Sequence, residues 1–154
     1  MKIIKTLALL FFASNAFAQC WTTVNTSSYS TIGLRTDGTF WGWGINSTGV
    51  LGFGAGSETF TTIFPPTQIG TDNDWSDTYA VAATTTLAIK TNRRLHSWSN
   101  NNYGQCGNGT FGLQNDVLVT QQIGTDEWKA VACSNSGYYS LVIKTELFGQ
   151  RFFT

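Results

Sequence analysis

The sequence is poor in the residues that make metal sites and catalytic centres. It contains one histidine, His96, and three cysteines, Cys20, Cys106 and Cys133, which lie far apart along the chain. Structural and catalytic metal sites use such ligands at short, characteristic spacings, and no C-x-x-C or paired-histidine motif is present. An odd number of cysteines also excludes a disulfide framework. We therefore expect no metal and no cofactor, with Cys106 and Cys133 buried as small hydrophobic residues.

Acidic residues cluster at one place, but without a partner that would make them catalytic. Asp72, Asp74 and Asp77 flank Trp75 in a turn-rich connection that offers no histidine or other base. We interpret this connection as a solvated loop. The glycine-rich stretch 42–56 lacks the Lys-Ser/Thr ending of a phosphate-binding loop. No catalytic residue is assigned, and the sequence does not predict an enzyme.

Charged residues are scarce. They make up 12% of the chain, with nine basic and nine acidic side chains. Loss of an N-terminal leader would remove two lysines and leave a net charge near −2. Without a basic stripe to neutralise phosphates, nucleic acid is not expected as a partner.

The only long apolar run belongs to an export signal. Two lysines precede the apolar stretch from Leu7 to Ala13, and Ala16-Phe17-Ala18 fits the small-x-small rule for signal peptidase. We predict a signal peptide over residues 1–18, cut before Gln19. No later segment approaches the ~20 apolar residues of a membrane helix. The chain is therefore expected to be secreted, to the periplasm, the medium or the cell surface, with no transmembrane segment.

The rest of the chain repeats itself. Gln68 to Asp72 returns letter for letter as Gln122 to Asp126, 54 residues later. Three similar segments begin at Trp21, Trp75 and Trp128. A fixed period of this length is typical of solenoids and propellers, in which each repeat is one supersecondary unit.

Two further alignments keep the same register. Residues 33–36 correspond to 88–91 and to 142–145, and residues 41–52 correspond to 96–107. We therefore predict the following organisation after the signal peptide: repeat 1 over 19–74, repeat 2 over 75–127, and an incomplete repeat 3 over 128–154.

Each repeat begins as a β-hairpin. From Ser30 to Thr36, polarity alternates, with Ile32 and Leu34 on one side of the chain. This is the period of a half-buried strand. Asp37-Gly38 follows and predicts a tight type I′ turn.

The return strand, 39–43, places Trp41 and Trp43 on one face, because side chains in a strand repeat every two residues. Gly42 leaves the opposite face bare, which predicts that another backbone comes close there. Residues 46–52, rich in glycine and asparagine, predict a turn.

The second repeat copies the first imperfectly. Asn92-Arg93 replaces Asp37-Gly38, and because arginine disfavours positive φ we expect a looser turn. Pro65-Pro66 predicts an extended connection at the end of repeat 1, and Val119-Thr120 a less rigid one in repeat 2. His96 occupies the repeat position of Trp41 and is interpreted as an altered packing or rim residue.

Taken together, the pattern W-x-x-V, then T-D-G-T-F-W-G-W-G-x-N-x-x-G-x-L-G, then P-x-Q-I-G resembles the regulator of chromosome condensation repeat. The resemblance covers nearly all of the chain after Gln19. The residues that carry it are Trp21, Asp37, Gly38, Trp41, Trp43, Gly44, Asn46, Gly49, Gly52, Trp75, Trp98, Asn101, Gly104, Gly107 and Trp128.

That resemblance implies an all-β fold: a partial β-propeller of about two and a half four-stranded blades, from a ring that normally has seven. Trp41 and Trp43 would then pack between blades or between strands. A small sheet that is apolar on both faces needs a blade on either side. With about 500 Å² left bare, each uncovered face would forgo roughly 12 kcal/mol. We therefore expect self-association, aggregation or partial disorder.

The end of the chain departs from the repeat. After Lys144-Thr145 the pattern calls for Asp-Gly-Thr-Phe-Trp, but the sequence continues from Glu146 to Thr154 without it. A shift of one base in the reading frame can restore Thr-Phe-Trp. Our hypothesis is that a frameshift has cut short a longer propeller protein.

The function expected from these features is that of a non-enzymatic, secreted or cell-surface scaffold that binds an unknown protein partner through its loops. One alternative is a carbohydrate-binding module, in which exposed Trp41, Trp43 or Trp98 would stack on a glycan. Another is a frameshifted fragment without an independent function.

Overall fold

The computed structural model describes residues 20–54 and 61–145. The signal peptide predicted over residues 1–18 and the aberrant segment 146–154 lie outside these ranges. Within them there are ten strands and no helix, and so no helix that could cross a membrane. The strands are β1 (Trp21–Thr26), β2 (Ser30–Arg35), β3 (Phe40–Ile45), β4 (Thr62–Gln68), β5 (Trp75–Val81), β6 (Thr85–Lys90), β7 (Leu95–Ser99), β8 (Val117–Gln122), β9 (Trp128–Cys133) and β10 (Ser140–Lys144).

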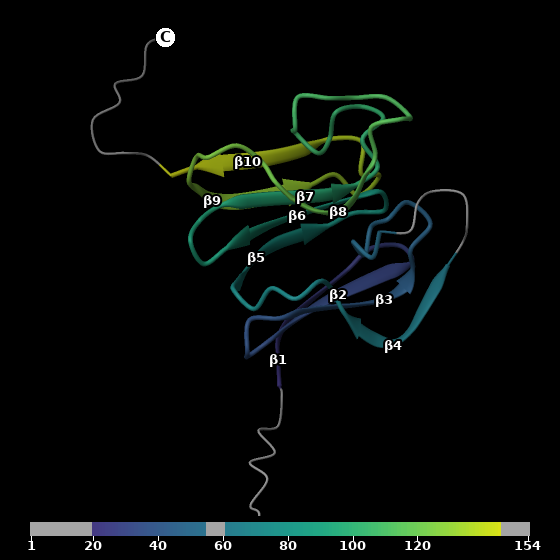
Figure 1. Cartoon of the computed structure of the whole chain (residues 1–154), viewed down its shortest axis with the longest axis vertical. Coiled ribbons are helices and arrows are strands. Elements are labelled where there is room, and N and C mark those ends of the chain that lie inside the picture. The colour runs from purple at the N-terminus through teal and green to yellow at the C-terminus, as the bar shows by residue number, and fades with distance from the viewer. Residues whose placement is uncertain (1–19, 55–60, 146–154) are drawn as a thin grey trace, which may run out of the picture.

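The strands form three antiparallel sheets, which are called blades here. Blade 1 is β1-β2-β3-β4, blade 2 is β5-β6-β7-β8, and blade 3 is the pair β9-β10. Each strand pairs with its neighbour in sequence, so each blade is a meander. Figure 1 shows the blades stacked one upon another, with blade 2 between the other two. The predicted all-β, partial propeller architecture is confirmed.

The main core lies between blades 1 and 2. Blade 1 and the segments that follow β3 and β4 contribute mostly aliphatic side chains, whereas the three largest side chains from blade 2 are aromatic: Trp75, Tyr79 and Trp98. The buried residues are Ile32, Leu34, Phe40, Val50, Leu51, Ile69, Trp75, Tyr79, Ala88, Trp98, Cys106 and Val117. A second cluster joins Leu87, Ile89 and Leu95 of blade 2 to Trp128, Val131 and Val142 of blade 3.

The β2–β3 turn differs from the predicted type. The amide of Gly38 donates to the carbonyl of Arg35 (3.0 Å), and the amide of Arg35 donates to the carbonyl of Thr39 (3.0 Å). Gly38 has φ +79°, whereas Asp37 does not have a positive φ. The turn is therefore a type I turn closed by a left-handed glycine, and the predicted type I′ turn is wrong.

The second hairpin is not looser, contrary to expectation. Arg93 takes the place of Gly38 with φ +65°, and its amide donates to the carbonyl of Lys90 (2.8 Å). The amide of Lys90 donates in turn to the carbonyl of Arg94 (3.0 Å). The sheet on either side holds the arginine in a left-handed conformation that favours glycine.

Replacing Arg93 by glycine should therefore stabilise the protein. The left-handed conformation costs a residue with a Cβ roughly 1–2 kcal/mol, and part of the gain is offset by the greater freedom of glycine in the unfolded chain. We expect Arg93→Gly to raise the unfolding free energy by about 0.5–1 kcal/mol in urea titrations. Arg94→Gly, one residue later, should lower it. An Arg93→Gly variant no more stable than the wild type would contradict this reading.

The bare face of β3 is filled by side chains, not by a backbone. A Cβ at Gly42 would lie 3.0 Å from Cδ2 of Leu51 and 3.1 Å from Cδ1 of Ile69. These side chains come from the segments that follow β3 and β4. The expected close backbone approach is wrong: the glycine leaves room for these two side chains, which would have to move slightly to admit a Cβ.

The proline-containing segment is a strand. Pro65 and Pro66 lie within β4, which pairs only with β3 and so forms the outer edge of blade 1. Proline is accepted at edges and at bulges, and the β3–β4 register shifts between Gly42 and Gly44, opposite these two prolines. Val119-Thr120 lies in the corresponding strand β8, paired with β7. The expectation of a less rigid connection there is wrong.

Candidate functional site

The β1–β2, β3–β4, β5–β6, β7–β8 and β9–β10 connections leave the blades at one end, which we call the loop end. Its described residues are 27–29, 46–54, 61, 82–84, 100–116 and 134–139. Hydrogen bonds join these loops across blades. Thr84 Oγ1 donates to the Gly137 carbonyl (3.2 Å), and Ser140 Oγ donates to the Gln105 carbonyl (2.7 Å). Loops from different repeats thus form one continuous surface.

The opposite end, formed by the β2–β3, β4–β5, β6–β7 and β8–β9 connections, is called the hairpin end and carries the ion pairs. Lys90 Nζ lies 3.0 Å from Asp72 and 2.8 Å from Asp74. Lys144 pairs with Asp126 at 2.9 Å. Burial by itself would lower the pKa of Lys90, but the hydrogen bonds that its ammonium donates to the two carboxylates outweigh this effect and hold that pKa above the ordinary value. Asp72 and Asp74 therefore form ion pairs with Lys90, and the interpretation of them as part of a solvated loop is wrong.

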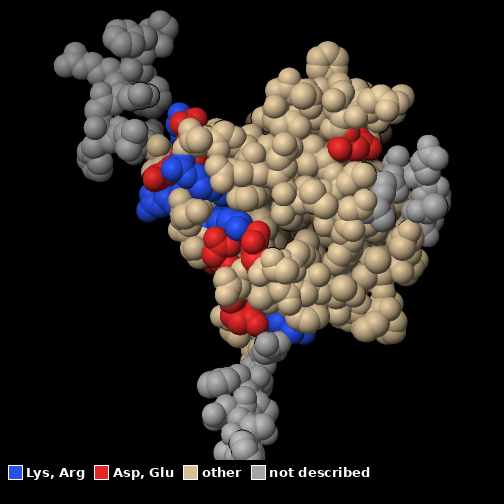
Figure 2. Space-filling model, in the orientation of Figure 1, with Lys and Arg blue, Asp and Glu red and all other residues tan. Residues whose placement is uncertain are grey.

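The loop end is almost free of charge. Asp116 is the one Asp, Glu, Lys or Arg among its described residues. Its carboxylate accepts hydrogen bonds from the Asn101 amide (3.0 Å) and from Nδ2 of Asn100 (3.3 Å). In Figure 2 blue and red atoms gather along one edge of the molecule, while the atoms of described residues on the opposite side are tan apart from one acidic group.

Large exposed side chains gather on this uncharged end. Two of them, Tyr103 and Tyr138, meet edge to face with ring centroids 5.2 Å apart, although they come from repeats 2 and 3. The exposed large hydrophobic residues of the loop end are Tyr29, Tyr103, Phe111, Leu113, Tyr138 and Tyr139. Around them the loops consist mainly of Ser, Thr, Asn, Gln and Gly.

The longest loop is held by one buried asparagine. Asn101 Nδ2 donates to Asn108 Oδ1 and to the Thr110 carbonyl, both at 3.0 Å. Its Oδ1 accepts from the Cys106 amide at 3.0 Å. Asn46 holds the first-repeat turn in the same way, accepting from the Leu51 amide at 2.9 Å. The predicted turn over 46–52 is confirmed, and these clamps hold the loop end in shape.

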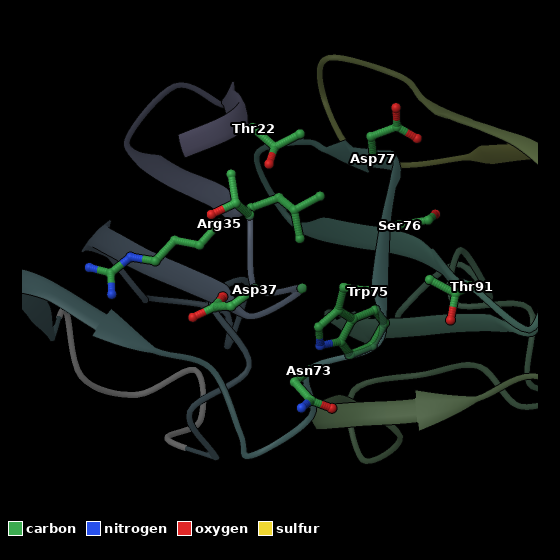
Figure 3. A pocket seen from close by; sticks show the side chains of 11 residues that line it. Thr22, Arg35, Asp37, Asn73, Trp75, Ser76, Asp77 and Thr91 are labelled. Carbon is green, nitrogen blue, oxygen red and sulfur yellow. The ribbon is translucent and has the colours of Figure 1, made fainter. Parts of the chain in front are cut away.

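A hollow of about 460 Å³ lies between blades 1 and 2 at the hairpin end. Figure 3 shows Trp75 near its centre, with Asp37 on one side and Thr91 on the other. Thr39 donates to Asp37 from its hydroxyl (2.6 Å) and its amide (3.1 Å), and these hydrogen bonds lower the pKa of Asp37. Ser76 donates its hydroxyl to the Ile89 carbonyl (2.6 Å). The hollow is thus lined in part by polar side chains that are held by hydrogen bonds within their own blades.

His96 is buried and packs edge to face on Trp75, with ring centroids 5.2 Å apart. Burial, together with the positive charge of Lys90, lowers its pKa below the ordinary value of 6.5, against the opposing charges of Asp72 and Asp74. The unfolded chain therefore binds a proton more readily than the folded chain does.

Stability should accordingly fall as the pH drops below about 6.5 toward the folded-state pKa of His96. Above that value the contribution is fully present. We expect a lower urea midpoint at pH 5.5 than at pH 7.5, and a smaller difference in His96→Phe, which keeps an aromatic ring without the titrating group. Equal pH dependence in the two proteins would show that His96 is not responsible.

The cysteines are free, and two of them are sheltered. Cys106 is buried and Cys133 is half-buried, while Cys20 is exposed. Burial raises the pKa of the Cys106 thiol to about 11 and that of Cys133 to about 12. Both stay protonated and unreactive near neutral pH. Within 20–54 and 61–145, no group of three His, Cys, Asp or Glu side chains is placed to hold a metal ion.

The residues of the sequence motif do not converge on one site. All six tryptophans of the chain lie in strands and so on the faces of the blades: Trp21, Trp41, Trp43, Trp75, Trp98 and Trp128. Asp37 and Gly38 lie at the hairpin end. The remaining motif residues lie in turns or at strand ends of the loop end: Gly44, Asn46, Gly49, Gly52, Asn101, Gly104 and Gly107.

The exposed residues of the loop end were not predicted from the sequence. Tyr138 stands at the repeat position of Tyr29, whereas Tyr103 replaces Thr48 in the register that aligns 41–52 with 96–107. The signal that could have revealed them is the near absence of charge from residues 99–117 and 133–140, combined with their aromatic content.

No protein-family model matches the chain, and no curated protein is similar to it in sequence. Solved structures do match. Prp20p from Saccharomyces cerevisiae, studied for its binding to Gsp1p and histones, superposes with a TM-score of 0.67 at 16% identity, over 83% of this chain and 32% of that one. Yeast RCC1 (Prp20) with Kap60 bound gives 0.62 at 16% identity, over 83% and 31%. Human WBSCR16 gives 0.59 at 20% identity, over 78% and 30%.

The chain spans about a third of the length of these structures. At such identities the likeness concerns the fold. The fold is that of the regulator of chromosome condensation repeat, as the sequence motif predicted.

Proposed function

We propose that the protein is a non-enzymatic, secreted or cell-surface scaffold whose loop end binds another protein. The observation that carries this proposal is the separation of surface chemistry between the two ends. The ion pairs of Lys90 and Lys144 lie at the hairpin end, whereas exposed aromatic side chains gather on loops whose described residues include a single carboxylate, that of Asp116.

The composition of the loop end suits protein recognition. Tyrosine and phenylalanine provide large, stiff contact surfaces at low entropic cost, and Ser, Gly and Asn between them provide adaptable hydrogen bonds. Antibody loops use the same mixture. The Asn101 clamp holds the long loop in place before a partner arrives, which lowers the cost of ordering on binding.

The solved structures support a role in protein contacts in general terms. The propeller Prp20p has been studied for binding to Gsp1p and histones, and it is also seen with Kap60 bound. Because this chain spans about a third of those proteins, their partners are not transferred to it.

The decisive experiment compares capture by matched variants from the organism's surface and culture fractions. The loop-end variant carries Phe111→Ser and Leu113→Ser, both at exposed positions. The control carries Arg93→Ser and Lys129→Ser at or next to the hairpin end. A protein retained by the wild type and the control but lost by the loop-end variant, even in 0.5 M salt, would support the proposal, since few charges are involved. Equal retention by all three, or loss in the control alone, would refute it.

Export is a separate part of the proposal and rests on the sequence of residues 1–18. Mass spectrometry of protein recovered outside the cytoplasm should give a chain that begins at Gln19. Recovery of an uncut chain from the cytoplasm would refute it.

Carbohydrate binding is the second candidate, and it depends on tryptophans that a sugar can reach. Trp98 is fully buried and donates Nε1–H to the Val50 carbonyl (2.8 Å), so it is not available to a sugar. The Arg35 guanidinium lies 3.5 Å over the ring of Trp41 and so covers one of its faces. A change of tryptophan fluorescence on titration with glycans would nevertheless favour this candidate over a protein partner.

Self-association is the last part of the proposal. Blade 1 and blade 3 each turn one face away from blade 2, and exposed hydrophobic residues lie on both of these faces, among them Trp21, Val24, Leu141 and Ile143. Apolar surface of this kind is stabilised by leaving water. A chain that stays monomeric and lacks β structure in circular dichroism would instead indicate a fragment without an independent function.

A further inference from the structure

Every blade has two different faces. Repeat-equivalent residues on one face are aliphatic, and their exposure changes along the stack. Ile32, Leu87 and Leu141 occupy the same repeat position in blades 1, 2 and 3, and they are 0%, 2% and 69% exposed. The next position on the same face behaves alike: Leu34 of blade 1 and Ile89 of blade 2 are buried, whereas Ile143 of blade 3 is exposed. We call this the aliphatic face. It is covered in blades 1 and 2 and uncovered in blade 3.

The opposite face is aromatic, and its exposure changes in the reverse order. Trp21 is 40% exposed in blade 1, whereas its equivalent Trp75 is 2% exposed in blade 2. Trp43 is half-buried in blade 1, whereas its equivalent Trp98 is fully buried in blade 2. We call this the aromatic face. It is covered in blade 2, where blade 1 packs against it, and uncovered in blade 1.

The interface between blades 1 and 2 shows how the two faces fit. Phe40 of blade 1 stacks on Trp75 of blade 2, with ring centroids 4.8 Å apart and planes at 17°. Tyr79 of blade 2 donates its hydroxyl to the Ile32 carbonyl of blade 1 (3.1 Å). Trp98 donates Nε1–H to the Val50 carbonyl. In each of these hydrogen bonds the aromatic face donates to backbone of the blade that covers it.

We infer that the uncovered aromatic face of blade 1 is covered by the uncovered aliphatic face of blade 3 from a second copy of this chain. The two copies therefore associate head to tail. This inference rests on the self-association part of the proposed function and assigns the occupant of each face. The two faces are the same pair that already meets between blades 1 and 2 and between blades 2 and 3.

Pairing of like faces is disfavoured by charge. Arg35 lies on the aromatic face, 5.0 Å from the ring of Trp21 and 3.5 Å from that of Trp41. Two aromatic faces pressed together would bring two guanidinium groups toward each other with water excluded, which is costly. Head-to-tail contact avoids this juxtaposition. Such a contact is heterologous, so each copy keeps one face free for the next.

The test uses two variants that each block one face at an exposed position. Val24→Arg places a charge on the aromatic face, and Leu141→Arg places one on the aliphatic face. Leu113→Arg, at the loop end, is the matched control. Light scattering should show concentration-dependent association in the wild type and in Leu113→Arg, and monomers for each face variant alone.

Mixing the two face variants gives the sharpest outcome. Val24→Arg keeps its aliphatic face and Leu141→Arg keeps its aromatic face, so an equimolar mixture should form a 1:1 pair of twice the monomer mass and nothing larger. A monomeric wild type would overturn the inference. Association of Leu141→Arg alone or of Val24→Arg alone, or no complex on mixing, would overturn it in favour of like-face contact or other surfaces.

Two controls keep these outcomes interpretable. Circular dichroism should show native β structure in every variant. If Leu141→Arg fails to fold, Ile143→Arg takes its place on the aliphatic face, and if Val24→Arg fails to fold, Thr31→Arg takes its place on the aromatic face. Capture of a protein partner through the loop end should be unaffected by either face variant and weakened in Leu113→Arg. Failure of head-to-tail pairing is thereby separated from failure of the loop-end proposal.

Discussion

Trp98→Ala should be among the most damaging single substitutions in this protein, lowering the unfolding free energy by about 3–5 kcal/mol. Trp98 is fully buried between blades 1 and 2, and its ring contacts Trp75, with centroids 5.9 Å apart. Its Nε1–H donates to the Val50 carbonyl at 2.8 Å. Truncation would leave a cavity on the aromatic face and remove one of two hydrogen bonds to the Val50 carbonyl, which would keep the one from Thr86 Oγ1 (3.0 Å).

The matched control is Trp43→Ala, the same substitution at the equivalent position of blade 1. Trp43 touches Trp21 (ring centroids 5.5 Å apart) but has no blade over it. We expect a loss of no more than about 1 kcal/mol, as for a partly exposed residue. Urea titrations at concentrations where the chain is monomeric measure both values. Similar losses for the two variants would show that coverage by a neighbouring blade does not decide the energetics.

The second large effect is expected on the aliphatic face. Leu87→Ala should lower the unfolding free energy by about 2–5 kcal/mol, because Leu87 is buried between blade 2 and blade 3 against residues such as Val131 and Val142. Leu141→Ala, the equivalent change in blade 3, should alter it by no more than about 0.5 kcal/mol, because Leu141 faces away from the stack.

This pair reports on a different interface from the tryptophan pair. Chemical denaturation of the monomeric chain again provides the measurement. A costly Leu141→Ala would mean that blade 3 has a covering element on its outer face, and a harmless Leu87→Ala would mean that blade 3 does not pack firmly on blade 2.

Periodic features of this fold could be predicted from sequence because they follow from local geometry. Alternation around Ile32 and Leu34 fixes which side chains face blade 2, and Trp41 and Trp43 share a face for the same reason. Recurrence of these patterns at 53–54 residues implied stacked units.

Turn conformations were harder to predict, because several backbone solutions satisfy the same residues. Asp-Gly is compatible with both a type I′ turn and a type I turn closed by a left-handed glycine, and the pairing of Arg35 with Thr39 selects the second. Arg93 adopts positive φ because the strands β6 and β7 impose it. Intrinsic preference is overridden there by the sheet.

The charged network could have been predicted. Asp72 and Lys90 are 18 residues apart, and so are Asp126 and Lys144, which makes a paired role in each repeat more probable than a solvated loop. The exposed aromatic residues of the loop end recur only in part. Tyr138 stands at the repeat position of Tyr29, but its ring partner Tyr103 replaces Thr48, and loop conformation determines which of them meet.

The claim on which the rest depends is that adjacent blades stabilise each other through contact of an aromatic face with an aliphatic face. A double-mutant cycle between Phe40→Leu and Trp75→Leu measures this contact directly, since the two rings stack at 4.8 Å across the interface between blades 1 and 2. We expect a coupling free energy of about 0.5–1.5 kcal/mol. Additive losses, with no coupling between the two positions, would contradict the stacked arrangement.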